Sequence, residues 1–460
     1  MAKSPQQQNM GTGSIPKLLA QLAIPAVVAQ IVNLLYNIVD RIYIGHMPEV
    51  GAYALTGVGL FAPITMLITA FAMLCGAGGA PRAAIAMGKG DKETAEKIVG
   101  NCFTVLLILA VVLTAVFYFA APGLLSWFGG SEATLPFGIT YARIYTLGSV
   151  FVLIVMGMNP FITTQGFAKF SMLTTVIGAC INIALDPLFI FVFDMGVAGA
   201  ALATVLSQAV SAVWILRFLT GKKTILKLKK ENMKLQGSII GPCLALGISS
   251  FVMISTESIL SISFTSSLAR YGGDLAVGAM TVMTSINMLV TMPLNGLCQG
   301  GQPLISYNYG AKKMDRVKKA FYCQFVSCIA YAGILWGCLM LFPQGFASIF
   351  SPDPQLVAYT AWALRIFLAG AISVGFQISC QQAFMALGQA KISLLMACLR
   401  KLILLIPLIF ILPLFFQSGA DKAFAVFLAE PVSDIAAATV TTITFFTFFR
   451  KLMKGDLLKG

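Results

Sequence analysis

The stretch GGAPRAAIAMGKGD at residues 78–91 recurs as GGQPLISYNYGAKK at residues 300–313, and this recurrence decides the architecture. A single shift of 222 residues places Pro81 on Pro303 and Gly88 on Gly310. The same shift aligns Gly51 with Gly273, Arg143 with Arg365, Gly166 with Gly388 and Lys169 with Lys391. One constant shift over most of the chain indicates two similar halves in tandem.

Composition places both halves in a lipid bilayer. The chain is 58% hydrophobic and 10% charged, whereas soluble domains are about 45–50% apolar and about 25% charged. Apolar stretches of about 20 residues, enough to cross a ~30 Å hydrocarbon core as a helix, recur along the sequence. We count twelve, at residues 17–43, 54–80, 97–121, 136–160, 171–193, 198–219, 239–268, 275–303, 320–342, 356–386, 394–416 and 422–449.

The distribution of Lys and Arg predicts the orientation in the membrane. Of the 31 Lys and Arg residues, we assign 26 to one set of alternate loops, Arg400 and Lys401 among them. The others are Arg41, Arg270 and Lys422 on the opposite loops, and Arg143 and Arg365 within spans. This asymmetry predicts a multi-pass membrane protein with both termini in the cytoplasm. It also explains the net charge of +14 without a nucleic-acid partner.

The expected fold is an all-α membrane protein whose twelve transmembrane helices form two pseudo-symmetric six-helix bundles. Six crossings return the chain to its starting side, so the two bundles share one orientation and enclose a site between them. The expected units are a tail at 1–16, a first lobe at 17–219, a basic cytoplasmic linker at 220–238, a second lobe at 239–449 and a tail at 450–460. The polar first sixteen residues show no cleavage pattern, so we expect no removable signal peptide. The linker run GKKTILKLKKENMK, residues 221–234, should lie near anionic head groups.

Five acidic residues fall inside the apolar spans, namely Asp40, Asp186, Glu257, Glu430 and Asp434. A carboxylate at a helix centre costs about 2.5–3.5 kcal/mol to insert, so each should face water or a partner. Asn33, Asn37 and Asp40 form one polar stripe at i, i+4 and i+7, and Tyr36 lies four residues before Asp40.

The fifth and sixth spans bring further oxygen atoms to the same depth. Asn182 and Asp186 are spaced i and i+4, and Thr204 follows on the sixth span. Together with Asp40 they form a set of hard oxygen ligands suited to Na⁺ or to a shared proton. The alternative is that Asn182 and Asp186 bond to the backbone near Pro187, which has no N–H of its own.

The motifs LYNIVDRIYIG, NIALDPLFIF, GVAGAALATVLSQ and QGGQPLISYNYGA resemble the MATE (multidrug and toxin extrusion) family, in its bacterial MepA-like branch, over essentially the full chain. The resemblance implies a cation or proton site in the first lobe at Asp40, Asn182, Asp186 and Thr204, with Tyr36 beside it. It also implies a hinge candidate at Pro25, where some members bend the first helix.

The second half departs from the resemblance. Glu257 resembles an acidic residue of the family's NorM-type branch that contributes to a second ion site, but its partner on span ten has no counterpart here. Glu257, Glu430 and Asp434 are therefore candidate contacts for cationic substrate, as are Asn33 and Asn37. The alternative for Glu257 is internal pairing with Arg143 or Arg365, because buried charges usually find partners.

These features predict an antiporter rather than an enzyme: multidrug efflux of cationic drugs or dyes in exchange for Na⁺ or H⁺, by rocking of the two lobes. The carboxylates would attract organic cations, and abundant Phe and Met would supply adaptable cavity walls. We expect membrane lipids as partners, a monomer, and no cofactor, because the ten single cysteines and lone His46 indicate no metal site.

Two other function classes remain as alternatives. A flippase or exporter of lipid-linked or polysaccharide substrates would need several cavity-lining cations, whereas we count five acids against two bases within the spans. A membrane-embedded enzyme would need motifs such as D-D-x-x-D, H-E-x-x-H or G-x-S-x-G, and the sequence contains none of these. A Walker sequence for ATP-driven transport is also missing.

Overall fold

The computed structural model describes residues 5–350 and 353–454, and within these ranges every regular element is a helix. Lys3 and Lys459, counted above among the cations of the two tails, lie outside these ranges. The first half contains α1 (Pro5–Thr12), α2 (Ile15–Gly45), α3 (Gly51–Lys89), α4 (Lys92–Trp127), α5 (Leu135–Leu147), α6 (Ser149–Thr164), α7 (Ala168–Pro187) with the π-helix η1 (Leu188–Val192), and α8 (Gly196–Thr220).

The second half follows the short 3₁₀-helix η2 (Lys230–Met233). It contains α9 (Gly237–Gly310), α10 (Met314–Leu341), α11 (Pro343–Ser348), α12 (Pro354–Phe367), α13 (Ala371–Ala386), α14 (Ala390–Cys398), the π-helix η3 (Leu399–Leu405), α15 (Ile406–Ile411), the 3₁₀-helix η4 (Leu412–Phe415) and α16 (Gly419–Met453).

The described residues contain the predicted number of membrane spans. Ten segments are each long and apolar enough to cross a bilayer, and α9 supplies two of them because its chain breaks at Gly273. Two further pairs of helices are long and apolar enough to cross a bilayer only when the two helices are counted together. These pairs are α5 with α6, bent by 56°, and α12 with α13, bent by 48°. Counting each bent pair as one span gives twelve, and the predicted fold class is confirmed.

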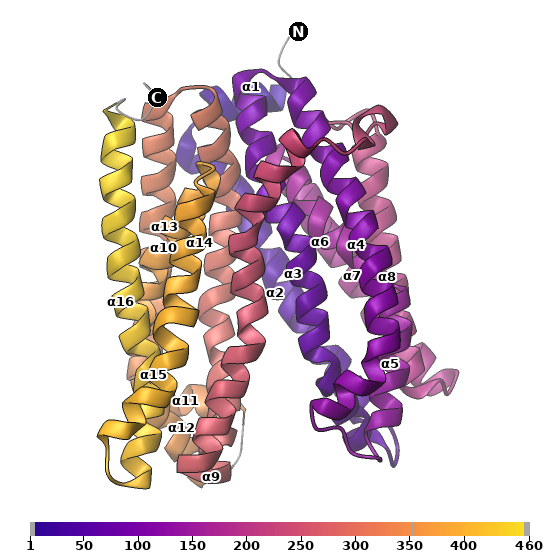
Figure 1. The fold of residues 1–460 in the computed structure, drawn as a ribbon, viewed down its shortest axis with the longest axis vertical. Coiled ribbons are helices and arrows are strands. Elements are labelled where there is room, and N and C mark those ends of the chain that lie inside the picture. Colours follow the sequence, from indigo (N-terminus) through magenta and orange to yellow (C-terminus); the bar gives the residue numbers. More distant parts are fainter. Residues whose placement is uncertain (1–4, 351–352, 455–460) are drawn as a thin grey trace.

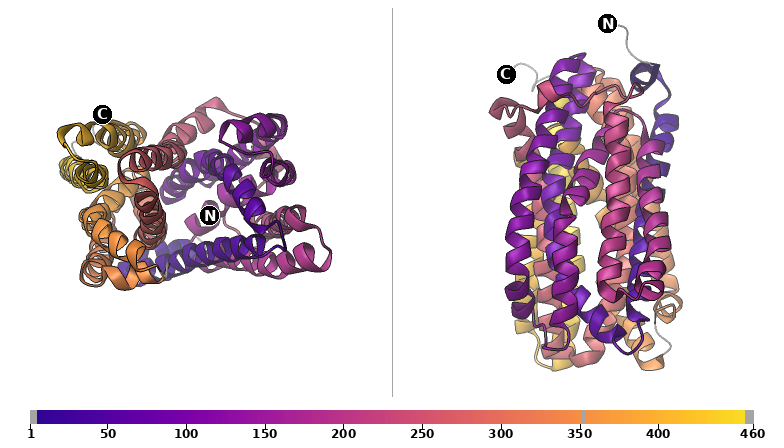
Figure 2. Two further views of the ribbon diagram at one scale, coloured as in Figure 1. Left: turned by 90° about the horizontal axis from the view of Figure 1, so that it is seen from below. Right: turned by 90° about the vertical axis from the view of Figure 1, so that its right-hand side faces the viewer.

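The repeat seen in the sequence is also present in the backbone. The bends occur at Gly148 and Gly370, which are related by the shift of 222 residues. Gly166 and Gly388, also related by it, both end a helix with positive φ, +90° and +73°. The two halves therefore share local geometry and order of elements, and they lie side by side with α1 and the last turn of α16 at the same end of the bundle (Figures 1 and 2). We call this the α1 end and the opposite one the α11 end.

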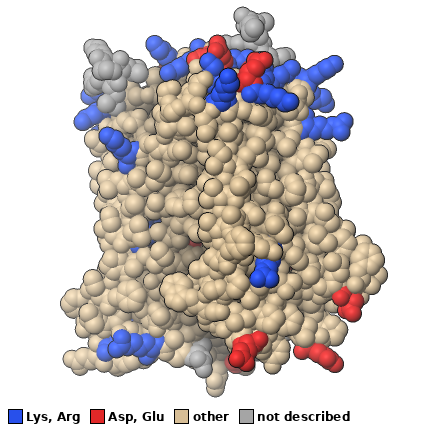
Figure 3. All heavy atoms as spheres, turned by 45° about the vertical axis from the view of Figure 1, so that its right-hand side comes forward, with Lys and Arg blue, Asp and Glu red and all other residues tan. Residues whose placement is uncertain are grey.

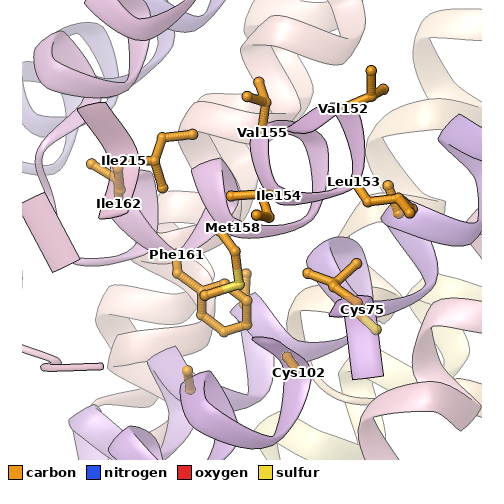
Figure 4. Close-up of a cluster of buried hydrophobic side chains, with 14 of the residues drawn as sticks. Cys75, Cys102, Val152, Leu153, Ile154, Val155, Met158, Phe161, Ile162 and Ile215 are labelled. Carbon is orange, nitrogen blue, oxygen red and sulfur yellow. The ribbon is translucent and has the colours of Figure 1, made fainter. Parts of the chain in front are cut away.

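Buried side chains hold the first half together around α6. Val152, Leu153, Ile154 and Val155 are consecutive in α6 and all buried, so this helix is covered on every side. In Figure 4, Cys75 of α3, Cys102 of α4 and Ile215 of α8 lie around it. A second core of buried residues is built from α9, α10, α12, α13 and α16. All ten cysteines are free thiols.

The segment between the halves is bound to the first half. The side-chain Oε1 of buried Gln165 accepts hydrogen bonds from Thr224 Oγ1 (2.8 Å) and from the backbone N–H groups of Ile225 (2.7 Å) and Leu226 (2.9 Å). Glu96 accepts a hydrogen bond from Lys229 Nζ at 2.6 Å. This ion pair raises the pKa of Lys229, chiefly through the hydrogen bond from its ammonium group to Glu96.

The halves meet backbone against backbone at the glycines of the opening motif. A Cβ added at Gly88 of α3 would overlap the carbonyl oxygen of Tyr307, and one added at Gly310 of α9 would overlap that of Ile85. Each glycine contacts the residue three positions before the other, as expected for two helices crossing on a pseudo-twofold axis. Only residues without side chains allow so close an approach of helix backbones.

Alanine at either crossing glycine should therefore loosen the contact. We expect Gly88→Ala and Gly310→Ala each to lower stability by about 1–3 kcal/mol, the usual cost of overpacking, seen as a lower unfolding temperature of the detergent-solubilised protein. Gly59→Ala in the same α3 is the control, because a Cβ there meets nothing within 4 Å. Equal unfolding temperatures for all three variants would contradict this account of the crossing.

Candidate functional site

Three helices of the first half bring the predicted polar residues together. Tyr36 and Asp40 lie one turn apart on α2, and Asn182 and Asp186 one turn apart on α7, while Thr204 comes from α8. Asn182 and Asp186 are fully buried and Thr204 nearly so. Because α2 and α7 pack closely along their length, the carboxyl groups of Asp40 and Asp186 meet side by side. We call these four residues, Asp40, Asn182, Asp186 and Thr204, the carboxyl cluster.

Hydrogen bonds link the members of the carboxyl cluster. Asn182 Nδ2 donates to Asp186 Oδ1 at 3.3 Å and to Thr204 Oγ1 at 3.4 Å. The carboxyl groups of Asp40 and Asp186 lie close enough to interact with one another. Two ionised carboxylates can only accept hydrogen bonds and repel one another, so a proton or a cation between them would be needed to relieve this repulsion. Sequence analysis left open that Asn182 and Asp186 bond instead to the backbone near Pro187. The hydrogen bonds described here join these two residues to side chains.

Three oxygen atoms of the carboxyl cluster are buried without a hydrogen-bond partner: Asp40 Oδ1, Asn182 Oδ1 and Asp186 Oδ2. Buried polar atoms are costly unless they are satisfied. Three unsatisfied oxygens in one cluster, two of them on carboxyl groups, suit a proton or a hard monovalent cation, which prefers oxygen ligands. The residues therefore fit the ion that the sequence predicted.

Two tyrosines of α5 complete this site and were missed in the sequence. Tyr141 lies beside Thr204, and Tyr145 stacks on Tyr141 with ring centroids 5.9 Å apart. Their spacing in YARIY places both on one helix face, but the same spacing is common in ordinary cores. Only the packing of α5 against α8 shows that they border the carboxyl cluster.

The predicted asparagines of α2 divide between two places. Asn37 donates from Nδ2 to the backbone oxygen of Asn33 at 2.6 Å and contacts Tyr36. Asn33 instead lines a cavity between the halves. Pro25 lies within α2, which continues on both sides of it, and its role as a hinge stays a prediction.

This cavity of about 170 Å³ is bounded by α2, α3, α6 and α7 of the first half and by α9 and α13 of the second. Its lining is rich in carboxamides and methionines: Gln30, Asn33, Asn159, Gln299, Gln302 and Gln382, with Met73, Met156 and Met172. Neither a charged nor a Phe side chain is among its lining residues within the described ranges. Sequence analysis predicted cavity walls of Phe and Met: the Met residues are present in this lining and Phe is not, and the carboxamides were not predicted.

The charges of the second half form a separate cluster. Arg400 donates from Nε to Asp434 Oδ1 at 2.6 Å and from Nη2 to Glu430 Oε1 at 3.0 Å. Lys401 donates to Glu257 Oε1 and, at 2.7 Å, to the backbone oxygen of Met253. Lys401, Glu430 and Asp434 are buried, whereas the Glu257 side chain is half exposed. We call these five charged residues the ion-pair cluster.

The ion-pair cluster corrects two sequence predictions. The partner of Glu257 is Lys401, so the predicted pairing with Arg143 or Arg365 is wrong. Arg400 and Lys401 lie inside a span, on η3, and not on a loop, so the count of five acids against two bases within the spans was also wrong. The sequence already indicated this position, because both residues fall within the predicted span 394–416. As neighbours on a helix they point in different directions, Arg400 to α16 and Lys401 to α9.

Two similar halves of membrane-spanning helices with a cavity between them define a membrane transporter. A sequence model of the MatE family matches residues 25–188 and 249–411, once in each half. The chain belongs to the MatE family.

Curated relatives and solved structures agree with this assignment. The multidrug export protein MepA of Staphylococcus haemolyticus is 23% identical over 87% of both chains, and that of Staphylococcus aureus (strain NCTC 8325 / PS 47) 22% identical over 92% of this chain and 93% of that one. A multidrug resistance MATE family transporter of the MOP superfamily, solved in an outward-facing conformation, is 25% identical with a TM-score of 0.91, covering 99% of this chain and 100% of that one.

Removing Arg400 should destabilise the second half, because two buried carboxylates would lose their cation. We expect Arg400→Met to cost about 3–5 kcal/mol, measured as a lower unfolding temperature in detergent. The triple variant Arg400→Met, Glu430→Gln, Asp434→Asn is the control and should be more stable than the single variant, because it buries no unpaired charge. A single variant as stable as the parent would show that these ion pairs contribute nothing.

Proposed function

We propose that this chain is a cation-coupled antiporter that exports amphipathic organic cations from the bacterial cytoplasm in exchange for Na⁺ or H⁺. Membership of the MatE family and the relatives named multidrug export protein support the transport of drugs and dyes. The observation that carries the coupling step is the carboxyl cluster, with its three buried and unpartnered oxygen atoms.

The ion would act by holding α2 against α7. With both Asp40 and Asp186 ionised, two negative charges repel one another in a poorly solvated site, and a proton or Na⁺ between them removes this repulsion. The distance between α2 and α7 then depends on whether the ion is bound. A bound ion shifts a conformational equilibrium only if it prefers one state, and this repulsion supplies the preference.

Helix α2 is also the element through which the ion would act on the second half. At its α1 end, α2 packs on α9 so closely that a Cβ at Gly300 would overlap Ala23, and one at Gly296 would lie 2.8 Å from Val27 Cα. Pro25 lies between these two contact residues, and Asp40 lies on the part of α2 beyond them. A movement of Asp40 relative to Asp186 would thus be transmitted along α2 to the interface between the halves, with Pro25 as the hinge.

The cavity between the halves that is lined by carboxamides and methionines, which we call the carboxamide cavity, is the proposed path of the substrate. Gln and Asn side chains both donate and accept hydrogen bonds, and Met side chains adapt to varied apolar surfaces, so the lining suits ligands of different shape. The positive charge of the substrate would be attracted by Asp40 and Asp186 and by the half-exposed Glu257. Competition between substrate and ion for these carboxylates would couple the two fluxes.

The proposed orientation places the α1 end in the cytoplasm. Figure 3 shows Lys and Arg gathered at this end, with fewer charges at the α11 end. This is the bias expected of cytoplasmic loops. The close crossing of Gly88 and Gly310 would then lie on the cytoplasmic side of the bundle and keep it closed, and a hollow between the halves is visible on the face that Figure 3 shows.

Export of a lipid-linked saccharide is less well supported. Such a substrate carries diphosphate and would need unpaired cations in its cavity, but the described lining of the carboxamide cavity has no Lys or Arg. Arg400 and Lys401, the buried cations of the second half, are paired with acids.

Neutral replacements of the two carboxyl groups test the coupling. We expect Asp40→Asn and Asp186→Asn each to reduce ethidium uptake into inverted vesicles, which corresponds to export from the cell, at least tenfold, with the Na⁺ gradient and the pH gradient imposed separately. Either amide removes the site that binds and releases the ion. Glu132→Gln is the control, since Glu132 is an exposed acid on the loop after α4 and should not matter.

The hydroxyl of Thr204 separates the two ions. A proton can reside on a carboxyl group alone, whereas Na⁺ needs several oxygen ligands, so Thr204→Val should reduce Na⁺-driven export and leave proton-driven export nearly unchanged.

Parental export rates in both Asp variants, under either gradient, would refute the carboxyl cluster as the coupling site.

A further inference from the structure

A groove of about 570 Å³ lies on the outer surface where the two halves meet, between α2 of the first half and α10 of the second. Leu19, Ala20 and Ala23 of α2 form one wall, Cys323 and Val326 of α10 the other, and Leu297 of α9 also lines the groove. It is distinct from the carboxamide cavity, with which it shares no lining residue.

The groove follows from how tightly α2 packs on α9. Gly296 and Gly300 let the backbone of α2 approach α9 directly, while α10 packs on another part of α9. The residues of α2 and α10 that face one another across the remaining space include the small Ala20, Ala23 and Ser327, which do not fill it. The space is therefore a consequence of the close contact between the halves.

The chemistry of the groove changes along its length. Ile24 and Val326 are about 62% and 61% exposed, although both belong to membrane spans, so the outer rim faces lipid chains. Lys319 and Pro16 lie at the other extreme, near the starts of α10 and α2, and Tyr322 follows Lys319 by one turn. The groove thus has apolar walls with a cation at the level where the helices leave the membrane.

We propose that this groove binds one anionic phospholipid of the leaflet at the α1 end. An acyl chain lies against Ala20, Leu297 and Val326, and the phosphate of the head group contacts the exposed Lys319. The ion pairs of the described residues do not use Lys319, so its charge is available. Neighbouring Arg316 and Lys318 add to the positive potential that draws an anionic lipid to this end.

The lipid would act on the arrangement of the two halves. Its binding surface is divided between α2 of the first half and α9 and α10 of the second, so separating or rotating the halves at the α1 end removes the site. A ligand that binds one arrangement only stabilises that arrangement. Occupancy of the groove therefore favours the state in which Gly88 and Gly310 are in contact. This inference does not depend on which ion drives transport.

Native mass spectrometry of the detergent-solubilised full-length protein tests the site, with dioleoylphosphatidylglycerol and dioleoylphosphatidylcholine as probes. The parent should bind the first phosphatidylglycerol about fivefold more tightly than phosphatidylcholine, because one lysine favours a head group with a net negative charge by this amount and the choline of phosphatidylcholine balances its phosphate. Lys319→Gln should abolish this preference. The matched control, Lys318→Gln, changes an exposed lysine on the same helix that does not line the groove and should keep it.

A bulky side chain placed in the groove distinguishes lipid binding at this site from a general attraction of anionic lipid to positive charge. Ala20→Phe, at an exposed position of α2, should weaken the first binding event of both lipids at least tenfold. Equal affinities for the two lipids in the parent, equal effects of the two lysine variants, or parental affinities in Ala20→Phe would each overturn the proposal.

Cys323 provides a test that needs no substitution. Its thiol lines the groove, so added phosphatidylglycerol should slow its alkylation by an N-alkylmaleimide, followed by peptide mass mapping. Exposed Cys338, farther along the same helix, should react at an unchanged rate. Unchanged labelling of Cys323, or equal slowing of both thiols, would contradict occupancy of the groove by lipid.

Discussion

The close approach of helix backbones between the two halves is the constraint on which the rest of the structure depends. At Gly88 and Gly310 each helix contacts the peptide backbone of the other, and at Gly300 α2 is held against α9 in the same way. Within a bilayer the hydrophobic effect does not drive helices together, so small residues and van der Waals contact must hold the halves. This arrangement joins the halves at the α1 end. It leaves two spaces between them, the carboxamide cavity and the groove between α2 and α10.

The halves share a backbone plan but differ in chemistry. In the first half, oxygen atoms of Asp40 and Asp186 are buried without partners. In the second half, Arg400 pairs with the buried Glu430 and Asp434, and Lys401 pairs with the half-exposed Glu257, so that only Glu430 Oε2 of this cluster is buried without a partner among the described residues. An unsatisfied cluster can gain and lose an ion, whereas breaking a buried ion pair leaves an uncompensated charge. Because of this difference we propose the first half as the coupling lobe. The ion pairs of the second half would serve to stabilise the structure.

Much of the site could be predicted because helical periodicity is local. Spacing alone placed Asn182 and Asp186 on one face, and span order put Asp40 and Thr204 at a matching depth. The prediction failed at Arg400 and Lys401, which were assigned to a loop because Lys and Arg usually lie there. Burial of a cation inside a span becomes favourable only when acids from other helices reach it, and that is a property of tertiary packing.

The sequence by itself determined the membrane class, the number of spans, the repeat and the residues of the carboxyl cluster. Each of these depends on composition or on spacing within one helix, or on a constant shift between halves. Only the tertiary structure decided which charges are paired, that Tyr141 borders Thr204, and that carboxamides line the cavity. These contacts join helices far apart in the chain, and helix rotation and crossing, which create them, are set by packing and not by local propensity.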